Sequence, residues 1–128
     1  MSQTEVQLES QPVSGTNATD TAQIVNRTSN RIRIKSVDII PKSAVSTHAS
    51  DYITTTVKKG SDTIASHTTN SSGGSALVAG TLKPLTLSGT GKILEIDAGG
   101  VIDVDVAENG TGPAYNHRVI VVGEVIRS

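Results

Sequence analysis

Three histidines are the side chains of this sequence best suited to metal binding or proton transfer, and their spacing argues against both. His48, His67 and His117 lie in different segments, and no local spacing brings two of them together. The chain has no cysteine, which could complete a zinc site or act as a nucleophile. We therefore expect the histidines to be surface or loop residues, and we expect neither a metal nor a cofactor.

Four acidic residues form the second candidate group. Asp103 and Asp105 share the polar face of one predicted strand, and Glu95 and Asp97 lie on the strand before it. Carboxylates clustered in this way can bind calcium. The run that begins at Asp103 lacks the third oxygen ligand and the glycine of an EF-hand loop, so solvated carboxylates are the preferred interpretation. Cation binding by Asp103 and Asp105 remains an open alternative.

Motifs of phosphate binding and nucleophilic catalysis are incomplete. The segment from Gly89 to Lys92 resembles a phosphate-binding loop, but Ile93 stands where serine or threonine is required. Thr86 occupies the place of the motif's first glycine. The sequence contains no G-x-S-x-G elbow, and nothing in it links a serine to a histidine and an acid. We therefore predict that the protein is not an enzyme.

Glycan chemistry has equally weak signals. Four acceptor-type sequons begin at Asn17, Asn26, Asn70 and Asn109, and coincidence explains them in a chain so rich in serine and threonine. The only aromatic residues of the Phe, Tyr and Trp group are Tyr52 and Tyr115. We therefore do not expect an aromatic platform for stacking sugars.

Length and composition indicate what kind of fold positions these residues. The chain has 128 residues, which suits a single domain. Valine and isoleucine outnumber leucine, and both Phe and Trp are missing, so the core is expected to be aliphatic and strand-rich. The net charge of −1 argues against nucleic acid as a partner. Apolar runs of about four residues are far short of the roughly 20 that cross a bilayer, and the start of the chain lacks a signal-peptide pattern, so we expect a non-membrane protein made in a cytoplasm.

Alternation with period two identifies the strands. Residues 31–35 alternate cleanly, and the apolar phase shifts near Ser36, where we predict a bulge. We predict two hairpins and a central strand; the hairpins join 52–58 to 63–68 and 92–96 to 101–106, and the central strand covers 118–126. Residues 42–50 suit either one helical turn or a plain loop.

About eight short strands with turn signals every 8 to 12 residues predict an all-β fold, an antiparallel β-sandwich of the jelly-roll-like kind. We assign this single domain to residues 23–128. Residues 1–22 are polar and carry acids without one Lys or Arg, so we predict a flexible, extended N-terminal arm. It is either a disordered tail or an arm that orders on a neighbouring subunit, in which case Val6, Leu8 and Val13 are the predicted capsid or intersubunit contacts.

Several segments resemble the head decoration, or cement, proteins of tailed bacteriophages. The resemblance runs from about Arg31 to Val122 and is carried by four segments, residues 36–41, 52–60, 79–87 and 98–105. It consists of threonine-rich strands, a central glycine-serine loop and a glycine turn before an acidic strand.

This resemblance implies a β-sandwich that binds the outside of an icosahedral capsid and bridges major capsid subunits. It also implies that the protein associates with itself, as a trimer rather than a dimer, and is located on the outer capsid surface of the virion after synthesis in the host cytoplasm. It supplies no catalytic residues. The alternative is a non-enzymatic binding module of a phage tail fibre or adhesion protein, with a carbohydrate or protein ligand.

Overall fold

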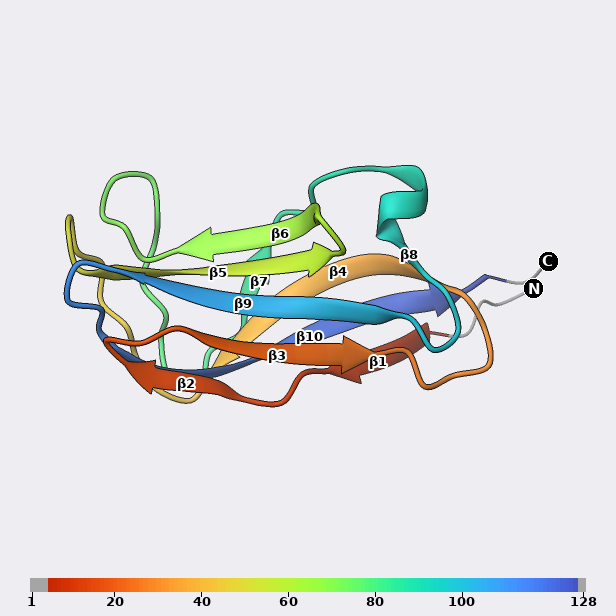
Figure 1. Cartoon of the computed structure of the whole chain (residues 1–128), viewed down its shortest axis with the longest axis horizontal. Coiled ribbons are helices and arrows are strands. Elements are labelled where there is room, and N and C mark those ends of the chain that lie inside the picture. The colour runs from red at the N-terminus through yellow and green to blue at the C-terminus, as the bar shows by residue number, and fades with distance from the viewer. Residues whose placement is uncertain (1–4, 127–128) are drawn as a thin grey trace.

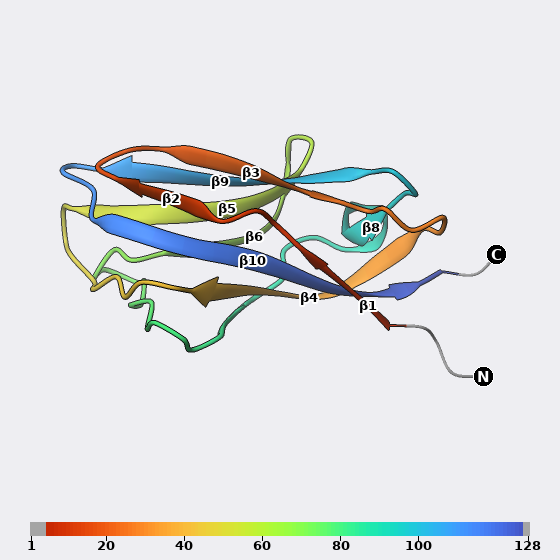
Figure 2. The same ribbon diagram turned by 90° about the horizontal axis from the view of Figure 1, so that it is seen from below.

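The computed structural model describes residues 5–126, which form two antiparallel sheets packed face to face (Figures 1 and 2). The elements are β1 (Glu5–Glu9), β2 (Val13–Thr16), β3 (Asp20–Val25), β4 (Ile32–Pro41), β5 (Tyr52–Lys59), β6 (Asp62–Thr68), β7 (Lys83–Leu85), the 3-10 turn η1 (Gly91–Leu94), β8 (Glu95–Ile96), β9 (Val101–Asn109) and β10 (Ala114–Val125). The predicted all-β sandwich is confirmed.

The pairing order explains the shape of the sandwich. In one sheet β1 and β2 both pair with β10, which pairs with β4, and β4 pairs in turn with β7 and β8. The other sheet has the order β3-β9-β5-β6. The first half of the chain therefore pairs with the second half in reverse: β2 with β10, β3 with β9, β4 with β7 and β8, and β5 with β6. Successive pairs alternate between the sheets, which is the strand order of a jelly roll.

The core between the sheets follows from the period-two alternation. Along β9, and along β4 on either side of one irregularity, every second side chain is buried, and the inward residues of these runs are aliphatic or proline. The hairpin of β5 and β6 and the central position of β10 are both as predicted. Residues 42–50 form a loop without a helical turn, and buried Val45 forms a β-bridge with Leu77.

The predicted bulge near Ser36 is also confirmed. Ser36 lies opposite Val122, whereas Ile34 lies opposite Gly123, so Lys35 is the extra residue on β4. Gly123 permits this close approach, because a Cβ there would collide with the Ile32 side chain and lie 2.8 Å from the Arg33 carbonyl oxygen. The bulge restores the inward phase, and Ile34 and Val37 are both buried.

The predicted boundary between an arm and a domain is wrong for residues 5–22. This stretch supplies β1, β2 and the first half of β3, which pair with β10 and β9 of the same chain. β1 and β2 pair with the free edge of β10, and β3 pairs with the free edge of β9. The segment has few apolar side chains, and its backbone hydrogen bonds to these strands stabilise it instead. Residues 1–4 of the predicted arm lie outside the described residues.

One of the predicted hairpins does not form. β8 pairs with β4 in the first sheet, whereas β9 pairs with β3 and β5 in the second. The connection between β8 and β9 therefore crosses from one sheet to the other, as the alternation of a jelly roll requires. The sequence Asp-Ala-Gly-Gly at residues 97–100 predicts a tight turn, but it does not determine which sheet the next strand joins.

Candidate interaction surface and buried polar clusters

The predicted N-terminal contact residues lie in the fold as follows. Val13 is fully buried in the core. Val6 and Leu8 are half-buried, lie opposite Gly123 and Val121 of β10, and Leu8 packs against the core. The three residues are therefore contacts within this chain, and Val13 has no exposed surface to offer a neighbouring subunit.

The four acidic residues separate into two pairs on different sheets. The Asp103 carboxylate accepts a hydrogen bond from Gln23 Nε2 at 3.1 Å, and that of Asp105 lies 4.0 Å from Lys58 Nζ. Glu95 and Asp97 lie instead beside Arg31, at 3.6 and 3.2 Å. Their predicted adjacency to Asp103 and Asp105 is wrong, because β8 and β9 belong to different sheets. Residues 5–126 contain no group of three or more His, Cys, Asp or Glu side chains placed to hold a metal ion.

Two of the three histidines are interior, contrary to the prediction. His48 is exposed, and its Nδ1 accepts hydrogen bonds from the backbone N–H groups of Ser50 and Asp51. His117 on β10 is 1% exposed, and His67 on β6 is 9% exposed. Both lie at strand positions that face inward. Their neighbours in the sequence are mostly polar, so the inward phase could not be recognised from the sequence.

His117 is only partly satisfied by hydrogen bonds. Its Nε2 is 3.0 Å from Thr55 Oγ1, and its ring centroid is 5.8 Å from that of Tyr115. Within the described chain, its Nδ1 is buried without a hydrogen-bond partner. Burial, with a smaller contribution from His67, lowers the pKa of His117 to about 4. Burial and the nearby Lys83 also lower the pKa of His67, whose Nε2 lies 3.1 Å from Ser75 Oγ. Both rings are therefore neutral at pH 7.

Asn26 forms a second buried polar cluster, at the end of β3. It is fully buried, and its Nδ2 group donates to the carbonyl oxygens of Asn30, Ile96 and Asp97 at 2.9, 3.2 and 3.0 Å. Its Oδ1 accepts from both the backbone N–H and the hydroxyl of Thr28. Asn26 thus ties the β3–β4 turn to the β8–β9 connection, and its burial leaves no room for a glycan on this sequon.

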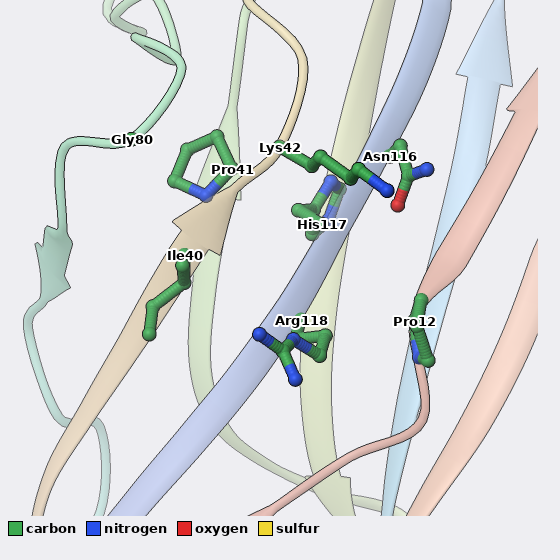
Figure 3. A pocket seen from close by; sticks show the side chains of 8 residues that line it. All are labelled: Pro12, Ile40, Pro41, Lys42, Gly80, Asn116, His117 and Arg118. Carbon is green, nitrogen blue, oxygen red and sulfur yellow. The ribbon is translucent and has the colours of Figure 1, made fainter.

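A groove runs along the outer face of the first sheet (Figure 3). It has a volume of about 590 Å³ and lies over the end of β4 and the start of β10. Ile40 and Pro41 come from β4, Arg118 comes from β10, and Pro12 comes from the link between β1 and β2. Arg118 is held by an ion pair of 2.7 Å with Glu9. The groove therefore combines apolar side chains with the cations Lys42 and Arg118, of which Arg118 is paired with Glu9.

The loop beside this groove carries the most exposed large apolar side chains of the described residues. Val78 is 57% exposed and Leu82 is 48% exposed. The loop is fixed against β4 by the hydrogen bond from the Gly80 N–H to the Pro41 carbonyl, and the Thr81 N–H closes a turn within the loop by donating to the Val78 carbonyl. Gly80 also lines the groove. We call the groove and this loop together the outer surface of the β4–β10 sheet. The segment 79–87 that carries part of the family resemblance includes Gly80 and Leu82 but not Val78 or the rest of the groove.

Comparisons with known proteins add little to this description. No protein-family model matches the chain, and no curated protein matches it. Among solved structures, the crystal structure of the infectious bursal disease virus VP2 subviral particle aligns with 99% of this chain and 40% of that chain, at 14% identity and a TM-score of 0.19. The chain thus spans 40% of the length of the matched chain, and at this TM-score the likeness supports no conclusion about function. Among residues 5–126 no helix is long and apolar enough to span a membrane.

Proposed function

We propose that this protein is a virion structural protein that decorates the outside of an icosahedral phage capsid and bridges its major capsid subunits. The sequence resemblance to head decoration proteins supports the proposal. The β-sandwich is compatible with it. The major capsid protein is the proposed partner, and the outer capsid surface of the virion is the proposed location.

The observation that carries the proposal is the outer surface of the β4–β10 sheet. Val78 and Leu82 expose about half of their side chains to solvent on a loop held in place by backbone hydrogen bonds. Exposed apolar side chains beside a groove that also carries charged groups are typical of protein interaction sites. Because this surface is preformed, binding would lose little conformational entropy.

Self-association is part of the proposal, as a trimer rather than a dimer. A core without Phe or Trp gains less from each buried side chain, so contacts with identical copies would add burial that the monomer lacks. The preference for a trimer comes from the family resemblance. Light scattering at micromolar concentration tests it, and a monomer mass in solution would limit association to the capsid surface.

The proposed function predicts a fixed copy ratio on capsids. The protein should bind expanded capsids of its phage and saturate at a constant ratio to the major capsid protein. The double variant Val78→Asp, Leu82→Asp should lose at least tenfold in affinity, because it places two charges at the centre of the interface.

A matched control comes from the opposite sheet. Val101 is the other large apolar residue with substantial exposure among the described residues, at 38%, and it lies on β9. Val101→Asp should bind capsids like the wild type. The proposal is overturned if the protein shows no saturable binding to capsids. Equal loss in both variants would exclude the loop as the specific contact.

A further inference from the structure

A second groove lies on the other sheet, at the corner formed by β5, β6 and the loop that follows β6. It has a volume of about 460 Å³, within the range of small-ligand sites. Its lining includes Tyr52 and Thr54 of β5, Thr68 of β6 and Asn70 of the loop. Because it belongs to the β3-β9-β5-β6 sheet, it does not overlap with the outer surface of the β4–β10 sheet.

The hydroxyl and amide groups of this groove are held in place by one another. Thr54 Oγ1 donates to Thr68 Oγ1 at 3.2 Å, and Thr68 Oγ1 accepts the backbone N–H of Asn70 at 3.1 Å. Asn70 Oδ1 accepts the backbone N–H of Ser72 at 2.9 Å. None of these contacts uses the two Nδ2 hydrogens of Asn70, and Thr54 Oγ1 keeps its acceptor lone pairs. The groove therefore presents fixed donors and acceptors to a ligand.

The groove carries no formal charge at neutral pH. Its lining residues are tyrosine, threonine, serine, asparagine, glycine and His67. His67 is neutral for the reason given above, since burial lowers its pKa. An ionic ligand such as a phosphate or a carboxylate would find no countercharge among the lining residues. The polar groups instead suit a neutral ligand rich in hydroxyls.

Tyr52 and two glycines complete the shape. Tyr115 is buried at 3% exposure, whereas Tyr52 is half-buried and lines the groove. Gly73 has φ +92° and open space where a side chain would stand, whereas a Cβ on Gly74 would collide with the carbonyl oxygens of Thr68 and Asn70. Glycine at position 74 lets the loop pack closely against the Thr68 and Asn70 carbonyl groups, and glycine at position 73 places no side chain beside the groove.

We propose that this groove binds a neutral saccharide, with the apolar face of one pyranose ring against Tyr52 and its hydroxyls bonded to Thr54 and Asn70. One tyrosine is too little for an extended stacking platform but is sufficient for a single ring, because the fixed polar groups supply the remaining contacts. The inference goes beyond the proposed function and does not depend on it, since the groove lies on a different sheet from the proposed capsid contact.

The test uses the isolated full-length protein labelled with ¹⁵N. We would titrate it with four neutral disaccharides: cellobiose, maltose, lactose and N,N′-diacetylchitobiose. At least one should shift the amide signals of Tyr52, Thr54 and Asn70 in a saturable way, with a Kd of about 1 mM or tighter. No saturable shift with any of the four, or shifts spread evenly over the surface, would overturn the proposal.

Variants separate recognition from folding. Tyr52→Ala should weaken binding at least tenfold, whereas Tyr52→Phe, which keeps the ring, should bind within about threefold of the wild type. Asn70→Asp keeps the oxygen that accepts from Ser72 but removes both amide donors, so it should also weaken binding. Thr56→Val, on the outer face of β5 but outside the groove, is the matched control and should bind normally. Unchanged binding by both Tyr52→Ala and Asn70→Asp would place the sugar elsewhere and reject the site.

Discussion

The two ends of the sandwich solve the problem of buried polar groups in opposite ways. At the end of β3, Asn26 is fully buried, and both its amide group and its side-chain oxygen have partners. Near the start of β10, His117 is equally buried, yet it bonds only to Thr55 and leaves Nδ1 unpartnered within residues 5–126. The C-terminal end of β3, which Asn26 follows, and the start of β10 lie toward opposite ends of the long axis (Figure 1).

The difference matters because only one of these groups can change its charge. An asparagine amide is neutral at every pH, so the Asn26 cluster contributes the same hydrogen bonds in acid and in neutral solution. A buried histidine is tolerated only while it is neutral, because protonation would create a charge in a low-dielectric interior. The Asn26 hydrogen bonds are therefore independent of pH, whereas the buried His117 is sensitive to acid.

The largest effect is expected from removing the Asn26 side chain. Asn26→Ala removes the side-chain partner of the Ile96 carbonyl and of the Thr28 N–H, whereas the Asp97 carbonyl keeps its hydrogen bond from the Gly100 N–H. Each buried group left unsatisfied costs about 1–3 kcal/mol. We expect the free energy of unfolding to fall by at least about 3 kcal/mol, measured by chemical denaturation at pH 7.

Asn30→Ala is the matched control for this experiment. Asn30 accepts the hydrogen bond from Asn26 Nδ2 through its backbone carbonyl, which the substitution retains, and the residue is exposed to solvent. Its effect should stay within about 0.5 kcal/mol. If Asn26→Ala were as mild as this control, the view of Asn26 as the tie between the β3–β4 turn and the β8–β9 connection would be wrong.

The second effect is a loss of stability in acid, caused by the histidine end. The pKa of His117 is about 4 in the folded state, against 6.5 for an ordinary histidine. The unfolded chain therefore binds this proton more readily, and stability is highest above pH 6.5 and falls as the pH drops toward 4. The shift corresponds to about 3 kcal/mol. His67 acts in the same direction, whereas burial raises the pKa of Asp38 and so opposes the trend.

Denaturation curves of the wild type between pH 7.5 and pH 4 would measure this loss of stability. A double variant would show whether His117 causes it. In the double variant Thr55→Val, His117→Leu, neither partner of the buried hydrogen bond is left unsatisfied. Its stability should depend much less on pH over this range. The assignment fails if the variant loses as much stability in acid as the wild type does.

The sequence could predict local features of the strands but not which strands pair with one another. Alternation in residues 31–35, with its phase shift near Ser36, was enough to predict a strand with a bulge, and the run 118–126, apolar on both faces, was enough to predict a central strand. These patterns are local properties of a strand. The partner of each strand is not local. The β8–β9 connection and the incorporation of residues 5–22 depend on which sheet edge is available, and no short segment encodes that.

The candidate sites were harder to predict for the same reason. Val78 and Leu82 are ordinary apolar residues in the sequence, and only the loop geometry exposes them. Tyr52, Thr54 and Asn70 come from two segments that meet because β5 pairs with β6. In the sequence, Asn26 matches a glycosylation sequon, and His117 was expected to be a surface or loop residue. Neither pattern predicts burial, because the partners that permit burial of a polar side chain are distant in the sequence.

The smallest effect is expected at a polar contact outside both buried clusters. Arg118 and Glu9 form an ion pair of 2.7 Å on the outer face of the first sheet, with side chains 48% and 39% exposed. Solvent and salt screen such a pair, so Glu9→Gln should change the free energy of unfolding by less than about 1 kcal/mol. The small difference from wild type should shrink further in 1 M salt, as roughly a 3 Å Debye length implies. A loss as large as that of Asn26→Ala would show that exposed and buried polar contacts are not distinct in this fold, and it would remove the basis for comparing the two ends by their burial.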